Sequence, residues 1–151
     1  MTILPPPPEP PWMRIARSYL GVRERLPNGQ PNPLIAQFFQ ATGFKGGTAA
    51  NAWCSAFANH CMLKAGLRGS GRANALSWLE WGIPLAMPVP GCIAVFDRPA
   101  TPTPDDGHVF FFVSEEKNWI NGVGGNQANM VCQRPYARAR LKGYRMPYIP
   151  E

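Results

Sequence analysis

Cysteine and histidine side chains are few in this chain, and together they can supply a nucleophile and its base. There are four cysteines and two histidines. Cys54 follows a tryptophan in the stretch NAWCSAF, at the start of a helix expected over residues 53–65. A cysteine nucleophile needs a lowered pKa, a nearby base and donors for the oxyanion, and a helix N-terminus favours negative charge. This position indicates a nucleophile, and a buried apolar thiol is the alternative.

The base of such a nucleophile is expected to be His108 rather than His60. His60 lies six residues after Cys54 on the same expected helix, about 9 Å along the axis and about 120° around it. A base must come within about 3 Å of the proton that it removes, so a structural role is expected for His60. His108 follows Gly107 and opens the most apolar expected strand, HVFFFV. An exposed histidine at a strand end is the alternative for His108.

A third polar group is needed to orient the imidazole, and the segment GVGGNQ offers one. If the strand of His108 turns near residues 115–117, its antiparallel partner brings Asn126 level with His108. Because side chains alternate along a strand, Gln127 is expected on the opposite face. Asn126 is therefore the predicted orienting residue. If Asn126 is only a turn residue, then Gln127 or a backbone carbonyl of residues 122–125 takes its place.

The remaining thiols, Cys61, Cys92 and Cys132, lie in apolar helix or strand contexts. The cysteines show no CxxC pair or other metal spacing, and two histidines support a zinc site poorly. We expect no metal and no cofactor. Free thiols are expected for a protein made in the cytoplasm.

The order of the expected elements predicts an α+β fold. Amphipathic spacing and end signals place helices over residues 11–20, 33–42, 53–65 and 70–82. Strands are expected at 92–97, 108–113, 118–123 and 130–133. Helices first and an antiparallel sheet second are typical of this class. A proline-rich arm over residues 1–11 precedes a single domain over residues 12–151.

Charge and hydropathy restrict the partners. The net charge of +6 favours an anionic partner, and the basic residues gather near the C-terminus at Arg134, Arg138, Arg140, Lys142 and Arg145. A solvated face is the alternative interpretation of that cluster, and no nucleic-acid motif accompanies it. No apolar run reaches the length of a transmembrane helix, and the N-terminus has no secretory signal pattern. The protein is expected to be made in the cytoplasm and to be a monomer.

Several motifs occur in an order that resembles a known group of enzymes. The stretches AWCSAFANHCMLKAG, VPGCIAVFDR, GHVFFFV, GVGGNQANMVC and LKGYR together look like the NlpC/P60 and CHAP cysteine hydrolases, in the small bacterial and phage subgroup with a WCSAF, GHV and GGNQ pattern. The resemblance spans residues 11–147. It implies a papain-like fold in which helices pack on a C-terminal antiparallel sheet, with Cys54 as nucleophile, His108 as base and Asn126 as third residue. Trp53 and Trp78 are expected to line a substrate groove.

Two departures from the family pattern affect this expectation. Relatives often have Asp after Pro-Gly, where this chain has Cys92. Many CHAP members carry Glu just before the Asn, where this chain has Gly124 and Gly125. The second departure bears on which group orients the histidine.

The function that the resemblance implies is hydrolysis of an amide bond in the peptidoglycan stem peptide. Without a signal peptide, the enzyme is expected to reach the periplasm or cell wall as a phage lysin or through a secretion machine such as type VI. An immunity protein or a component of the machine is then an expected partner. A non-catalytic wall-binding or phage structural module is the competing class. An acyltransferase or deamidase with the same dyad is a third interpretation.

Overall fold

Three α-helices and a six-stranded antiparallel sheet build the part of the chain that the computed structural model describes, residues 3–4, 8–49, 51–98 and 107–149. The predicted α+β class is confirmed. Residues 1–2 and 5–7 of the expected proline-rich arm lie outside the described residues. So does the segment 99–106, which precedes the strand of His108.

The helices come first in the chain, as the sequence predicts. They are α1 (Pro11–Ser18), α2 (Pro33–Phe39) and α3 (Cys54–Lys64). The side chain of Asn32 accepts a hydrogen bond from the amide of Leu34 at 3.0 Å, and Pro33 occupies the first helical position. Both features satisfy or remove amides that a helix start leaves unpaired, so the local sequence determines where α2 begins.

The strands form one sheet in the order β1-β6-β2-β3-β4-β5. Their bounds are β1 (Ile83–Leu85), β2 (Ile93–Asp97), β3 (Gly107–Glu115), β4 (Trp119–Gln127), β5 (Met130–Ala137) and β6 (Leu141–Met146). The sheet is thus a meander over β2 to β5, with β6 returning beside β2. Every pairing is antiparallel.

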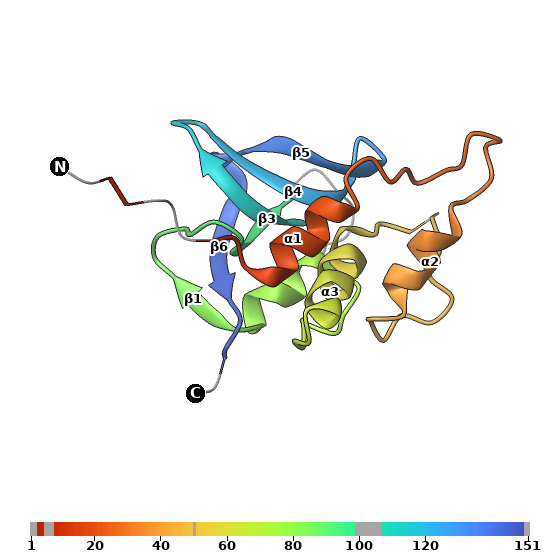
Figure 1. Cartoon of the computed structure of the whole chain (residues 1–151), viewed down its shortest axis with the longest axis horizontal. Helices are drawn as coiled ribbons and strands as arrows, with labels where there is room; N and C mark the ends of the chain where they lie inside the picture. Colours follow the sequence, from red (N-terminus) through yellow and green to blue (C-terminus); the bar gives the residue numbers. More distant parts are fainter. Residues whose placement is uncertain (1–2, 5–7, 50, 99–106, 150–151) are drawn as a thin grey trace.

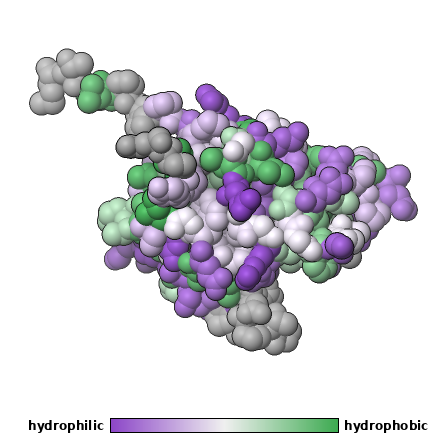
Figure 2. Space-filling model, turned by 90° about the horizontal axis from the view of Figure 1, so that it is seen from below, coloured by the Kyte–Doolittle hydropathy of each residue, from purple (hydrophilic) through white to green (hydrophobic). Residues whose placement is uncertain are grey.

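The sheet separates two apolar clusters. The inner cluster joins α1, α2 and α3 to side chains such as Val95, Val109, Phe111 and Val123. The outer cluster lies on alternate residues of the same strands and contains Cys92, Ala94, Phe96, Phe110, Phe112, Ile120 and Tyr144. Figure 1 shows α1 and α3 on one side of the sheet, with α2 beyond α3. Figure 2 shows apolar and polar side chains intermingled on the face seen from below.

The helix expected over residues 70–82 is wrong in kind and in extent. A 3₁₀ helix, η1, covers Ala75–Glu80 instead. The segment before it stays a loop because the buried side chain of Asn59 hydrogen-bonds to its backbone, at Gly71 N (2.8 Å) and Arg72 O (3.1 Å). Gly71 has φ +72°, which a continuous right-handed helix excludes.

The sheet is larger than the sequence predicts. Strands β4 and β5 extend beyond the expected ranges, to Gln127 and Ala137. Strands β1 and β6 lie outside every range that the sequence predicts as a strand. Strand β6 belongs to the basic C-terminal cluster, so its apolar pattern is interrupted by Lys142 and Arg145 and the period-two signal is weak.

Candidate active site

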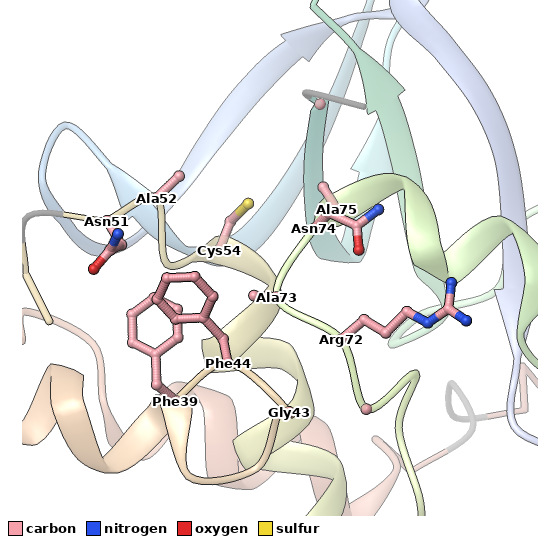
Figure 3. Close-up of a pocket in the computed structure, with 12 residues that line it drawn as sticks. Phe39, Gly43, Phe44, Asn51, Ala52, Cys54, Arg72, Ala73, Asn74 and Ala75 are labelled. Carbon is pink, nitrogen blue, oxygen red and sulfur yellow. The ribbon is translucent and has the colours of Figure 1, made fainter. Parts of the chain in front are cut away.

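Cys54 is the first residue of α3 and faces a cavity of about 700 Å³. The N-cap residue of this helix, Trp53, makes no side-chain capping hydrogen bond to it. The cavity walls are mostly apolar or small, with Phe39, Phe44, Ala52, Ala73 and Ala75 among them, and Arg72 and Asn74 add polar groups. Figure 3 shows the Cys54 sulfur pointing away from α3 into the space between Ala52 and Ala75. A thiol that faces a cavity from the first residue of a helix suits an acyl acceptor.

Buried contacts hold the first turn of α3 in place. The indole of Trp53 donates to Glu24 Oε1 at 3.0 Å, and its ring lies against Gly125. The hydroxyl of Ser55 donates to Arg72 O at 2.7 Å and accepts from the indole of Trp78 at 2.9 Å. These bonds tie the residues on both sides of Cys54 to other elements, so the thiol occupies a fixed position.

His108 is the second residue of β3 and is only 1% exposed. Its ring stacks on Tyr136 of β5, with ring centroids 4.7 Å apart and an angle of 15° between the planes. The phenol of Tyr136 in turn accepts a hydrogen bond from Arg98 Nε at 3.1 Å. Burial lowers the pKa of His108 to about 4; the hydrogen bond with Gln127 works against this shift, and the charge of Arg98 adds to it. The imidazole is therefore neutral near pH 7 and able to accept a proton.

Gln127 determines which nitrogen of His108 carries the proton. The Gln127 amide nitrogen donates to Cys132 O at 2.7 Å and to Gly122 O at 3.4 Å. Its carbonyl oxygen must therefore face His108 Nε2, 2.7 Å away, and accept a hydrogen bond from that atom. The proton then sits on Nε2 and the lone pair on Nδ1. Nδ1 is buried and has no hydrogen-bond partner among the described residues, so it is the atom that can act as a base.

The expected placement of Asn126 and Gln127 is reversed in the structure. Residues Gly124 to Gln127 of β4 lie opposite only Cys132 to Met130 of β5, so β4 contains one extra residue. This bulge includes Asn126, which has φ +57°. A bulge of one residue shifts the alternation of side chains, so Gln127 takes the face on which Asn126 was expected. Gln127, not Asn126, contacts the imidazole.

The structure brings Cys54 and His108 to the same end of β3 but on different walls. Gly107 lines the cavity of Cys54, and the next residue, His108, lines a second pocket of about 230 Å³. Val109 belongs to the inner cluster with Cys54, whereas Phe110 packs with His108 on the outer face. Within the described ranges, Gly107, which has no side chain, is the one residue of the His108 strand that lines the cavity of Cys54.

The expectation that Trp53 and Trp78 line a substrate groove is wrong. Both side chains are fully buried at 0% exposure and serve as core residues around the first turn of α3. Sequence spacing places these tryptophans near Cys54, but it cannot distinguish an indole buried in the core from one that lines a groove. His60 forms a hydrogen bond with Tyr19 Oη at 2.8 Å and packs on Phe38, which agrees with its expected structural role.

The described residues hold no cluster of three or more His, Cys, Asp or Glu side chains that could bind a metal ion. The four cysteines, all within the described ranges, form no disulfide with one another. No helix in the described part of the chain is long and apolar enough to cross a membrane.

Comparison with known proteins rests on structure alone. No protein-family model and no curated protein sequence matches the chain. Among solved structures, the P60 domain of antigen MAP1272c from M. avium paratuberculosis is similar, with a TM-score of 0.53 and 16% sequence identity. The likeness covers 92% of this chain and 91% of that one. At this identity the comparison shows the fold: the chain has the fold of a P60 domain.

Proposed function

We propose that the protein is a papain-like cysteine hydrolase that cleaves an amide bond in the stem peptide of peptidoglycan. The observation that carries this proposal is the hydrogen bond between Gln127 and His108. It leaves an unprotonated, unpartnered Nδ1 at the strand end that also borders the cavity of Cys54. A neutral imidazole held by a neighbouring amide and a thiol at a helix start are the two groups that acyl transfer through a cysteine requires.

In the proposed reaction, Nδ1 of His108 takes the proton of the Cys54 thiol, and the sulfur attacks the amide carbonyl carbon. The oxyanion that forms is placed near the backbone N–H of Cys54, at the positive end of α3. The C–N bond then breaks as Nδ1 returns the proton to the leaving amine. Water attacks the resulting thioester and gives a proton to Nδ1. The C–S bond breaks, and the thiol recovers that proton.

Gln127 is a positioning residue in this reaction, in the role that sequence reasoning assigned to Asn126. Its carbonyl sets the rotation of the imidazole, and Tyr136 holds the plane of the ring. An amide supplies no negative charge, so it orients the imidazolium without forming an ion pair with it.

Peptidoglycan is proposed as substrate because of the P60 fold, the net charge of +6 and a cavity large enough for a peptide segment. A basic protein associates favourably with an anionic wall polymer. We further propose action in the periplasm or cell wall, after phage-mediated lysis or delivery by a secretion machine. For a delivered toxin, an immunity protein is the proposed partner.

The test is incubation of purified peptidoglycan with the protein, followed by mass spectrometry of the released muropeptides. We expect new fragments from the parent protein, none from Cys54→Ala or His108→Gln, and parental yield from His60→Gln, the matched histidine control. Fragments that persist in Cys54→Ala refute cysteine catalysis. Intact peptidoglycan in all samples, with correctly folded proteins, supports the wall-binding module instead.

A further inference from the structure

A second pocket, of about 230 Å³, lies beside His108 and carries positive charge. Its walls include Arg98, His108, Asn126, Gln127, Arg134 and Tyr136. Among the described residues, no carboxylate lines it. Two guanidinium groups in a small pocket, without an acidic wall residue from the described part of the chain, favour an anion.

In this pocket, the side chains of Arg134 and Asn126 make no hydrogen bond to a described residue and can therefore bind a ligand. Arg134 is exposed and makes no ion pair or side-chain hydrogen bond with a described residue. By contrast, Arg138 of the same basic cluster pairs with Glu115 at 3.0 Å, and Arg145 donates to Leu79 O. Only part of the cluster is therefore used internally. Of the two arginines in it that have no partner among the described residues, Arg134 lines the pocket and Arg140 does not.

The bulge of β4 gives this pocket its second donor. Asn126 is held at φ +57°, a conformation that costs a non-glycine residue energy and is tolerated best by Asn. The same bulge turns Gln127 toward His108 and leaves Asn126 lining the pocket. One backbone irregularity therefore positions both the imidazole and a free amide beside it.

The proposed reaction determines which half of the substrate reaches this pocket. The acyl half bonds to Cys54 and remains in the cavity that contains the thiol. The amine half must receive its proton from His108 Nδ1, so it leaves on the side of the imidazole. In the proposed reaction, the pocket beside His108 is then the one nearer to the leaving amine.

We propose that this pocket binds a carboxylate carried by the amino acid on the leaving side of the scissile amide, with Arg134 as the residue that selects for it. Asn126 provides an additional hydrogen bond to the same group. This inference rests on the proposed function and narrows it: the substrate is a peptide whose leaving residue has a free carboxylate, not a carboxamide.

The test uses two stem peptides that differ only at that group, one with a free carboxylate on the leaving residue and one with a carboxamide. Turnover is measured with the parent protein, Arg134→Gln and Arg140→Gln. Binding of both peptides to Cys54→Ala, alone and combined with each arginine substitution, is measured by calorimetry. Arg140 is the matched control, because it is an exposed arginine of the same basic stretch that lines neither the Cys54 cavity nor the pocket beside His108.

We expect Arg134→Gln to weaken binding and raise KM for the carboxylate peptide about tenfold, the scale of one charge-assisted hydrogen bond at a partly exposed site. The carboxamide peptide should change less than about twofold, and Arg140→Gln should leave both unchanged. Equal effects of Arg134→Gln on the two peptides overturn the carboxylate site while hydrolysis stands. Selective binding by Cys54→Ala without turnover by the parent protein keeps the site and overturns the hydrolase. If neither selective binding nor turnover is observed, both the carboxylate site and the hydrolase are overturned.

Discussion

Gln127 holds His108 through a single hydrogen bond of 2.7 Å. The amide nitrogen of Gln127 donates to two backbone carbonyls, so its amide oxygen must face His108. The imidazole is fixed in one tautomer without any charged partner among these contacts. The consequences for catalysis, reactivity and stability can each be measured.

Loss of the Gln127 amide should reduce the rate of the proposed reaction without weakening substrate binding. We expect Gln127→Ala to lower kcat by roughly 10- to 100-fold with little change in KM, because orientation of a base contributes only part of the effect of general-base catalysis. Gln133→Ala, an exposed glutamine on β5, is the matched control. Steady-state kinetics on muropeptides decides this, and a parental kcat in Gln127→Ala refutes the positioning role.

Gln127→Glu should shift the pH dependence of the reaction. A carboxylate at this position favours the protonated imidazole, so the pKa of His108 rises from about 4. The acidic limb of the kcat/KM profile should therefore move to higher pH than in the parent protein. An unchanged acidic limb, in a variant that still turns over, indicates that a group other than His108 titrates in catalysis.

Alkylation should distinguish Cys54 from the other thiols. Burial raises the pKa of Cys92 to about 11 and raises that of Cys61 further, so both should react slowly near neutral pH. Cys54 faces the large cavity and should react fastest with iodoacetamide. The label is located by peptide mass mapping, and equal labelling of Cys54 and Cys61 contradicts the prediction.

The same assay tests whether the thiol and the imidazole act together. His108→Gln should slow alkylation of Cys54 about tenfold or more, because the thiol then loses its base. His60→Gln is the control and should leave the rate unchanged. If the rate in His108→Gln equals that of the parent protein, the two side chains on the different walls of β3 do not cooperate in the resting protein.

Stability should fall in acid because His108 is buried in its neutral form. Its pKa is about 4 in the folded protein, against 6.5 for an unperturbed histidine, so the unfolded chain binds the proton first as the pH falls. The stabilisation is complete above a pH of about 6.5 and is lost as the pH falls to about 4, with a total of roughly 3 kcal/mol.

Urea unfolding between a pH of about 7.5 and about 4 measures this effect as the difference between the parent protein and His108→Gln. The lowered pKa of His60 acts with the same sign, but it remains in both proteins and cancels in the difference. Parallel stability curves for the two proteins contradict a buried neutral His108.

Contact between β4 and the start of α3 should depend on the absence of a side chain at Gly125. A methyl group there would lie 2.7 Å from the Trp53 ring and 2.8 Å from Phe57 Cβ. We expect Gly125→Ala to destabilise the protein by about 1–3 kcal/mol, as measured by thermal unfolding. At Gly43 the nearest atom is 3.9 Å away, so Gly43→Ala is the control with little effect. Equal melting temperatures for the two variants refute the close packing.

Local signals in the sequence determined the elements that carry the chemistry. The cap at Asn32 with Pro33, the start of α3 at Cys54 and the apolar strand after Gly107 all appear in the structure where the sequence predicts them. Each depends on interactions between residues close in the chain, such as capping and side-chain alternation, so a linear pattern is sufficient. The order of helices and strands likewise predicts the α+β class.

Tertiary structure decided which side chains face one another. The bulge at Asn126 arises from the pairing of β4 with β5 and reverses the expected faces of Asn126 and Gln127. The hydrogen bonds of Asn59 prevent a helix at residues 70–74 although Asn59 lies 12 and 13 residues before the atoms that it contacts. Trp53 and Trp78 become core residues because other elements enclose them. These outcomes depend on contacts between distant segments, and no local pattern encodes the register or the enclosure that produces them.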